Sequence, residues 1–233
     1  MQAGSMQSKE RAAIPELQLC HEFFPLCPVT MRLHLIRHGE TDWNATRRVQ
    51  GQMESRLTEA GRQQATELAP QLRPFAIDRV VCSTSIRARE TADILFGASQ
   101  LTVQYQDNLR EIHLGPWEGN LYDDLAELDP EQFHNFWNEP DRFSLAGAET
   151  FHQLQQRGVD AVKKIVARAT EENVAIVSHG AFIKSVLCHF EQRPLAKLWD
   201  PPRMHNCAHS IMEFDHAGHA RIVRYAGENY RQD

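Results

Sequence analysis

Short apolar runs and longer amphipathic segments alternate along most of the chain. A short run rich in Leu, Ile and Val and bounded by polar residues is typical of a buried strand. The clearest runs are MRLHLIR at 31–37, IDRVVC at 77–82 and NVAIVS at 173–178. With a weaker run and two closing runs, the pattern predicts six strands, at 31–37, 77–82, 101–105, 173–178, 208–214 and 219–225.

The segments between these runs carry apolar residues at helical spacing. Thr58 is a suitable N-cap, and Leu68 and Leu72 lie on one face of the helix that it begins. Further helices are predicted at 85–96, 149–170 and 180–190, whereas 112–149 is irregular and aromatic with short helical pieces. Strands that alternate with helices predict an α/β fold, a single-domain three-layer sandwich with a largely parallel central sheet and helices on both faces.

The first thirty residues lack this regular pattern. We predict that residues 1–30 are a poorly structured leader, from an upstream start or an added segment, and that 31–233 form the domain. The stretch 17–29 resembles the core of a signal peptide only faintly, because His21, Glu22 and two prolines interrupt it. An extra strand or short helix docked on the domain remains the alternative.

Composition and charge restrict the partners. The 233 residues are 42% hydrophobic and 24% charged, which is ordinary for a globular domain. The net charge of −6 argues against a nucleic-acid partner, for which a basic excess is expected. No apolar run approaches the ~20 residues of a membrane-spanning helix, so no membrane partner is expected. An anionic ligand must therefore be held by a local cluster of cations. A homodimer is left open.

The cysteines give information on the compartment. There are five, scattered without a CxxC pair, at Cys20, Cys27, Cys82, Cys188 and Cys207. This spacing predicts neither a disulfide framework nor a zinc site. We expect reduced thiols that mostly pack in the core, and a cytoplasmic location.

Three of the predicted strands end in residues suited to phosphate chemistry. The first ends in Arg37-His38, the second runs into Arg87, and the third ends in His179-Gly180. In parallel sheets, ligands bind beyond the carboxyl ends of the strands, so these groups should converge. Guanidinium groups bind phosphate oxygens in pairs, and a helix beginning at Gly180 adds backbone donors. The sequence therefore predicts a phosphate pocket at this sheet edge.

Four ordered motifs carry a resemblance to a known family. LIRHGETDWN at 35–44 resembles the signature of the histidine phosphatase superfamily, also called the phosphoglycerate mutase-like family. STSIRARETA at 83–92, LREIHLGPWEG at 109–119 and VSHG at 177–180 resemble its later blocks, in the same order. The resemblance spans roughly 31–225. It implies a phosphatase-type member that acts on a small-molecule phosphate ester without cofactor or metal.

The resemblance also implies roles for individual residues. His38 would be the nucleophile that forms a phosphohistidine, and Glu111 the general acid and base. A neutral imidazole can attack only if its other ring nitrogen is held as a donor. A carboxylic acid beside the leaving group can supply the proton that an alkoxide needs.

The same resemblance implies a clamp for the phosphate. Arg37, Arg87 and His179 would surround its oxygens, with Asn44 as a further contact and Gly180 supplying the helix N-terminus. Charge stabilisation is most of the catalysis in phosphoryl transfer, so these groups would do the work of a metal ion.

Other assignments of the acidic and thiol groups are weaker. A cysteine-based phosphatase needs C-x5-R, but Cys82 and Arg87 are spaced C-x4-R, so Cys82 is expected in the core. Glu40 and Glu118 are alternative acids, although structural hydrogen bonding in their turns is the stronger expectation for both. Glu111 therefore remains the residue expected to be the general acid and base.

His205, Cys207 and His209 suggest a metal site, because alternate residues of a strand share one face. No carboxylate or second cysteine completes a familiar ligand set, so we predict no metal. We expect 204–209 to pack or to rim the pocket instead, with His205 as a candidate substrate contact.

Charge between 112 and 150 favours a phosphatase over a cofactor-dependent phosphoglycerate mutase. This segment holds nine acidic residues and one base, Arg142. We expect it to form a lid that repels polyanions, and its aromatic residues, with Trp43, Arg47 and Arg48 opposite, are candidates for contacting an apolar leaving group. A non-catalytic phospho-ligand binding module is the second alternative, but His38 and Glu111 are both present.

Overall fold

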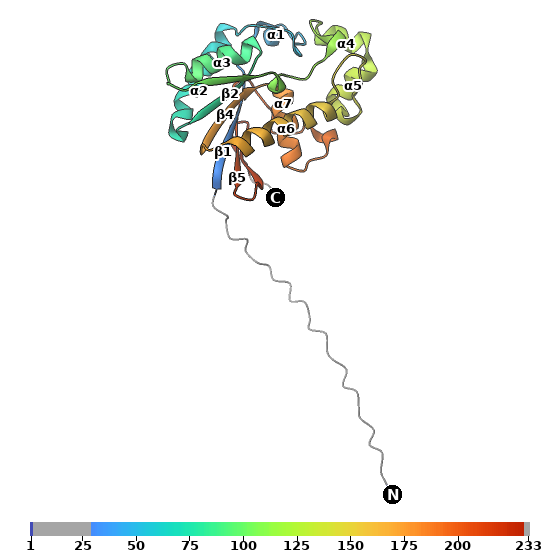
Figure 1. The fold of residues 1–233 in the computed structure, drawn as a ribbon. Helices are drawn as coiled ribbons and strands as arrows, with labels where there is room; N and C mark the ends of the chain where they lie inside the picture. Colours follow the sequence, from blue (N-terminus) through green and yellow to red (C-terminus); the bar gives the residue numbers. More distant parts are fainter. Residues whose placement is uncertain (2–28, 231–233) are drawn as a thin grey trace.

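A computed structural model describes Met1 and residues 29–230 of this protein. One mixed sheet runs through the structure, in the strand order β3-β2-β4-β1-β5-β6-β7 (Figure 1). The predicted leader therefore lies outside the described residues, apart from Met1 and the two residues that open the first strand. Its structure stays a prediction.

The strands match the predicted runs within one or two residues, except for a short seventh strand that was not predicted. Their bounds are β1 Val29–Arg37, β2 Arg79–Ser83, β3 Val103–Gln106, β4 Asn173–Ser178, β5 His209–Asp215, β6 Ala220–Tyr225 and β7 Glu228–Asn229. The helices are α1 Asp42–Ala45, α2 Glu59–Leu72, α3 Ile86–Phe96, α4 Tyr122–Leu128, α5 Pro130–Asn138, α6 Phe151–Arg168 and α7 Gly180–Phe190. Thr58 caps α2 as predicted, accepting a hydrogen bond from the Gly61 amide.

The sheet is parallel in one half and antiparallel in the other. β3, β2, β4 and β1 pair in parallel, whereas β5, β6 and β7 pair antiparallel. The reversal follows from the path of the chain. α7 leads away from the carboxyl edge, and the segment 191–208 then returns to it, so β5 starts beside the end of β1, with His209 opposite Ile36. The returning segment thereby lies at the same edge as the strand ends.

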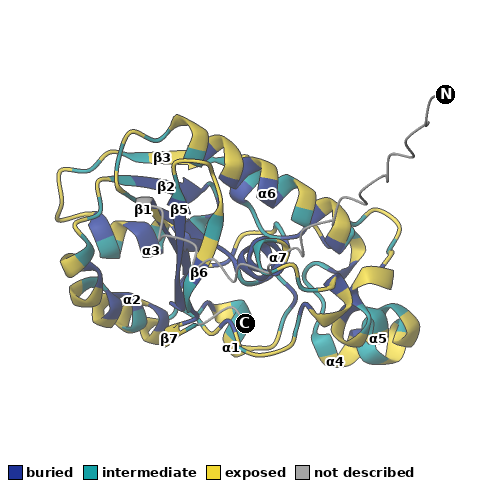
Figure 2. Cartoon of the chain, turned by 90° about the horizontal axis from the view of Figure 1, so that it is seen from below, coloured by how far each residue is buried: buried dark blue, intermediate teal, exposed yellow. Residues whose placement is uncertain are grey.

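Alternating side chains of the central strands build two hydrophobic cores, one on each face of the sheet. In β4, Val174 and Ile176 join the core that includes residues of α6 and α7. Ala175 and Val177 join the core that includes residues of α2 and α3. Figure 2 shows the buried sheet between these two helix layers. The predicted three-layer α/β sandwich is therefore confirmed.

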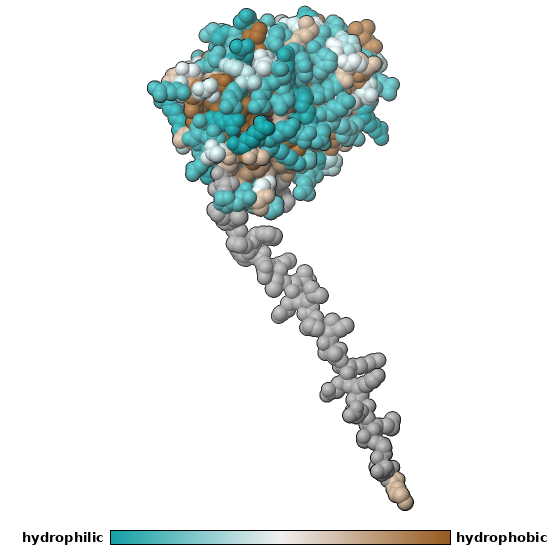
Figure 3. All heavy atoms as spheres, viewed as in Figure 1, coloured by the Kyte–Doolittle hydropathy of each residue, from teal (hydrophilic) through white to brown (hydrophobic). Residues whose placement is uncertain are grey.

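The region 112–150 contains α4 and α5 and is fixed to the domain by aromatic packing. Trp117, Phe136 and Phe143 are buried in one cluster, with ring centroids 5.3–5.9 Å apart. The outer surface seen in Figure 3 is mostly hydrophilic, with apolar residues in separate small groups. Within the described residues, no helix has the length and apolar character needed to cross a membrane.

A close backbone contact fixes the loop after β1 against the start of α2. A Cβ atom on Gly61 would lie 2.0 Å from the Glu40 carbonyl oxygen, and one on Gly39 would lie 2.4 Å from the Gly61 oxygen. Both distances are too short for any side chain. These two glycines therefore allow the loop that carries His38 to rest directly on α2.

We predict that Gly61→Ala destabilises the protein by about 1–3 kcal/mol, the usual cost of overpacking, because the Glu40 backbone must move. Urea unfolding measures the change. Ala60→Ser at the exposed neighbouring position is the control and should stay within about 0.5 kcal/mol. Equal stability of the two variants would contradict the contact.

Candidate active site

The ends of β1 and β4 place two histidines side by side at the carboxyl edge of the sheet. Arg37 pairs with Ser178 in the parallel register, so the next residues, His38 and His179, emerge together. Their ring centroids are 5.3 Å apart. Arg87 reaches the same place from the first turn of α3, which follows β2. The predicted convergence of these four side chains is found.

His38 is held in the tautomer that can act as a nucleophile. Its Nδ1 lies 2.7 Å from the Gly39 carbonyl oxygen, which can only accept, so Nδ1 carries the proton. The lone pair is then on Nε2. Burial, and then the nearby charges of Arg87 and Arg37, hold the pKa of His38 well below its ordinary value. The imidazole is therefore neutral near pH 7.

Arg87 is buried and Arg37 is half-buried, and both are held mainly by backbone oxygens. The terminal nitrogens of Arg87 donate to the carbonyl oxygens of Gly51 and Met53, each at 2.8 Å. Arg37 donates through Nη1 to the Met204 carbonyl oxygen. The Nε atoms of both arginines are buried without a hydrogen-bond partner among the described residues. Such donors are suited to an anion, since an unpaired buried donor is costly.

His179 lies beside His38 and belongs to the same buried group. Its Nε2 is hydrogen-bonded to the Ser83 hydroxyl at 2.7 Å, while Nδ1 has no partner among the described residues. Burial is the largest cause that lowers its pKa, followed by the charge of Arg87. A bound phosphate dianion would counter both effects, so a cationic His179 in the clamp requires the anion.

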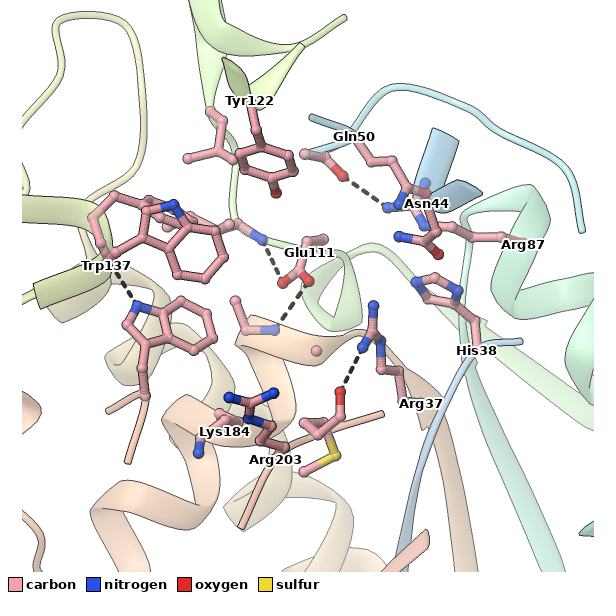
Figure 4. Close-up of a pocket in the computed structure, with 18 residues that line it drawn as sticks. Arg37, His38, Asn44, Gln50, Arg87, Glu111, Tyr122, Trp137, Lys184 and Arg203 are labelled. Atoms are coloured by element: carbon pink, nitrogen blue, oxygen red, sulfur yellow. Dashed lines mark hydrogen bonds between the residues drawn. The ribbon is translucent and has the colours of Figure 1, made fainter. Parts of the chain in front are cut away.

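Glu111 is fixed at the beginning of α7. Its carboxylate accepts hydrogen bonds from the amides of Ile112, Ala181 and Phe182, each at 3.0 Å. These bonds leave the carboxylate facing the cavity across from His38 (Figure 4). A Cβ atom on Gly180 would lie 3.3 Å from the Nε atom of Arg37. The glycine therefore lets the arginine lie against the start of the helix.

These side chains open into one cavity of about 410 Å³. Its lining includes the predicted Arg37, His38, Asn44, Arg87, Glu111 and Gly180, whereas His179 is fully buried and does not line it. Asn44 is held at the N-terminus of α1 by a capping box with Thr41. A buried neutral imidazole, cations with free donors and an oriented carboxylate together form a site suited to phosphate.

The family assignment follows from comparison with known proteins. Residues 33–226 match the model of the histidine phosphatase superfamily (branch 1). The chain belongs to the histidine phosphatase superfamily. It is 36% identical over 166 residues to Phosphoglycerate mutase-like protein 4 of Arabidopsis thaliana, covering 70% of this chain and 71% of that protein. It is 35% identical over 167 residues to a metal-independent phosphoserine phosphatase of the same plant, covering 68% of each.

Solved structures agree with this assignment. YhfR of Bacillus stearothermophilus superposes with a TM-score of 0.82 and 40% sequence identity, covering 85% of this chain and 98% of that one. The expected family and the expected phosphatase type are therefore confirmed. The individual residue roles stay predictions.

The cavity of this histidine phosphatase also contains residues that the sequence analysis missed. These include Gln50, Lys184, Trp199 and Arg203. The sequence could have predicted Lys184 as a cavity residue, because it follows Gly180 by four residues and shares its helix face. No sequence pattern could have predicted Arg203, since it is in the irregular segment that leads to β5.

Three residues that were predicted to rim the pocket do not line the cavity. Both ring nitrogens of His205 are bonded to backbone oxygens, of Asn206 and Ala226, and the residue lines a separate depression, so a substrate contact is wrong for it. Arg47 pairs with the exposed Asp123. Arg48 donates to the Gly119 carbonyl oxygen beside Trp43.

The expectation of an acidic lid over the pocket was also wrong. None of the nine acidic residues between 112 and 150 lines the cavity, and Glu111 is the only carboxylate among the described lining residues. The helical periodicity of α4 and α5 turns their polar faces to solvent, while Tyr122, Phe136 and Trp137 face the cavity. Charge in this segment is therefore no argument about the substrate.

The alternative acids have structural roles, as expected. The Glu40 carboxylate accepts from the Thr58 hydroxyl at 2.7 Å. Glu118 accepts from the amides of Gln52 and Leu114, at 2.9 and 2.8 Å. Neither lines the cavity, so Glu111 is the carboxylate available to a ligand.

The segment suggested as a metal site does not form a strand face. His205 and Cys207 precede β5, which begins at His209. In the described part of the chain, no three His, Cys, Asp or Glu side chains are grouped in a way that could hold a metal ion. Cys82, Cys188 and Cys207 are buried free thiols, as expected for packing residues; the other two cysteines lie outside the described residues.

We predict that His38 and His179 both remain neutral as the pH falls from 8 to 6.5. Burial and the neighbouring arginines lower both pKa values, so protonation in the folded state requires a pH below 6.5. The unfolded chain binds these protons near pH 6.5, so the free energy of unfolding should also fall below that pH. NMR of ¹⁵N-histidine, assigned with His38→Asn and His179→Asn, measures the titration. An imidazolium signal from His38 at pH 6.5 would be incompatible with this environment.

Proposed function

We propose that this chain is a metal-independent phosphomonoesterase that hydrolyses small-molecule phosphate esters through a phosphohistidine on His38. Glu111 acts as the general acid and base. The observation that carries the proposal is the Nδ1–H donated by His38 to the Gly39 oxygen, which leaves Nε2 unprotonated in a site that Arg87 and Arg37 also occupy. The Arabidopsis relative named as metal-independent supports the absence of a metal requirement.

In the first step, Nε2 of His38 attacks the phosphorus atom of the ester. The N–P bond forms as the bond from phosphorus to the leaving oxygen breaks, and Glu111 donates its proton to that oxygen. The alcohol then leaves. The backbone donors on Glu111 fix the position of its carboxyl group, so proton transfer needs no rearrangement of the side chain.

Arg37, Arg87 and His179 stabilise the charge on the phosphoryl oxygens during both steps. Preorganised donors in a buried site are worth more than in water and need no reorganisation during the reaction. We assign to these oxygens the guanidinium groups of Arg37 and Arg87, which line the cavity, together with Nδ1 of His179, which has no partner among the described residues.

In the second step, Glu111 is a carboxylate and takes a proton from a water molecule. The water oxygen attacks phosphorus, the N–P bond breaks, and inorganic phosphate leaves. His38 is again neutral and Glu111 is again protonated, so the cycle closes.

The charge of the cavity supports hydrolysis over phosphoglycerate mutation. The described lining residues carry four cationic groups and one carboxylate. Each phosphate carries about −1.5 to −2 at pH 7, so a carboxylate-bearing bisphosphate intermediate would exceed the positive charge of the cavity. A single phosphate ester does not.

We predict that a ³²P-labelled substrate leaves acid-labile, base-stable phosphate on His38, in the presence of EDTA as well as without it. His38→Ala should abolish labelling and turnover while the circular dichroism spectrum is retained. Steady-state rates with and without EDTA should agree within about twofold, because cationic side chains supply the charge. Label on a cysteine, or strict dependence on an added divalent metal, would contradict the mechanism. Conversion of 3-phosphoglycerate to its 2-isomer would favour the mutase instead.

We predict that Glu111→Gln slows an alkyl phosphate roughly 10²–10⁴-fold, the usual range for general acid catalysis. Transfer from p-nitrophenyl phosphate to His38 should suffer much less, since its phenolate leaves without a proton. Rapid-quench kinetics should then show a burst, because dephosphorylation still needs Glu111. Glu127→Gln, an exposed change on α4, is the control. Equal losses for both esters without a burst would leave Glu111 a positioning role only.

A further inference from the structure

The cavity extends well beyond the phosphate end. Its outer wall consists of apolar and aromatic side chains, namely Ile112, Leu114, Tyr122, Phe136, Trp137 and Trp199. The rings of Trp137 and Trp199 contact each other, with centroids 5.3 Å apart, and Nε1 of Trp199 donates to the Phe136 carbonyl oxygen. This bond fixes the indole, so the wall presents mostly carbon to a ligand. At about 410 Å³, the cavity has room for a phosphate and a leaving group of moderate size.

Two cations interrupt this apolar wall. Lys184, on α7, and Arg203, in the returning segment, lie together at the end of the cavity away from His38 (Figure 4). The buried ammonium of Lys184 donates to the carbonyl oxygens of Asp200 and Pro202, at 2.5 and 3.1 Å. Lys184 thus holds the short stretch of chain that carries Arg203.

Arg203 differs from the neighbouring arginines in having no ionic partner. Within residues 29–230, no carboxylate lies within ion-pair distance of its guanidinium, and no hydrogen bond to it is formed. Arg193, in the same segment, instead pairs with Glu191 at 2.8 Å. Figure 4 shows the Arg203 guanidinium directed into the cavity. Its donors are therefore available to a ligand.

The positive charge of the cavity exceeds the negative charge of one phosphate. Of the described lining residues, Arg37, Arg87, Lys184 and Arg203 are cationic, and Glu111 is the one carboxylate. A phosphate monoester contributes about −1.5 to −2 at pH 7, which leaves about one positive charge without a counterpart. That excess is located at the outer end, because the other two cations face the phosphate.

We propose that Arg203, positioned by Lys184, binds a carboxylate of the substrate, so that the enzyme prefers phosphate monoesters whose leaving group has an apolar or aromatic body ending in one carboxylate. This inference rests on the proposed phosphatase function. The guanidinium fork matches the two oxygens of a carboxylate, and the aromatic wall covers the body between the two anionic ends. Burial lowers the pKa of Lys184 to about 8, and a carboxylate bound nearby would raise it again.

Two esters of the same shape test the proposal. One is 3-(4-phosphonooxyphenyl)propanoate and the other is its propanamide, which lacks the charge. Two methylene groups separate the tail from the ring, so the phenol leaves equally well from both. The wild-type enzyme should hydrolyse the carboxylate with a kcat/KM roughly 10- to 100-fold higher, as expected for a hydrogen bond to a charged group.

Arg203→Gln should reduce this ratio to about one, mainly by raising KM for the carboxylate. Arg203→Lys should recover part of the preference, because the charge returns without the fork. Arg142→Gln is the matched control: this arginine of the 112–150 region is exposed, pairs with Glu139 and does not line the cavity. It should leave the ratio unchanged.

The outcomes separate the two proposals. Hydrolysis of both esters at equal kcat/KM, or a preference that survives in Arg203→Gln, would overturn the carboxylate site and leave the phosphatase intact. Release of phosphate from neither ester would overturn the phosphatase function, and the carboxylate site with it.

Discussion

The rest of this structure depends on the charges of the buried Arg87 and the half-buried Arg37, neither of which has a direct carboxylate partner among the described residues. Removing a charge from water costs several kcal/mol unless good hydrogen bonds replace the lost hydration. For Arg37 and Arg87, backbone oxygens supply part of that replacement, and the Nε atom of each has no hydrogen-bond partner among the described residues. An anion completes the site. Burial and these same charges lower the pKa of His38 and keep it neutral, so the groups that we assign to phosphate binding also prepare the nucleophile that we assign.

The fold meets this constraint with segments that come from different parts of the chain. The carbonyl oxygens of Gly51 and Met53 belong to the loop between α1 and α2, and that of Met204 to the returning segment before β5. The Gly39–Gly61 contact fixes the first loop against α2. The loops at the carboxyl edge of the sheet therefore supply part of the stabilisation of the two arginine charges.

Two different sets of elements form the two ends of the cavity. Strand ends and helix starts form the phosphate end, where a shift of one register position would separate His38 from His179. The outer end is formed by the aromatic region 112–150 and by the returning segment, which the sheet does not fix directly. In this chain the outer wall is aromatic, with Arg203 at its end.

The layers of the fold and the convergence of the candidate catalytic residues could be predicted from the sequence. Apolar runs predicted the core strands, and residues that directly follow parallel strands must share one edge, so Arg37, His38 and His179 could be placed together without a structure. Features that depend on loop paths and on helix orientation could be seen only in the tertiary structure. The polar faces of α4 and α5 turn away from the cavity, and the path of segment 191–208 both reverses β5 and brings Arg203 to the site. Local patterns encode periodicity and strand ends, whereas the placement of an irregular segment depends on packing against distant parts of the chain.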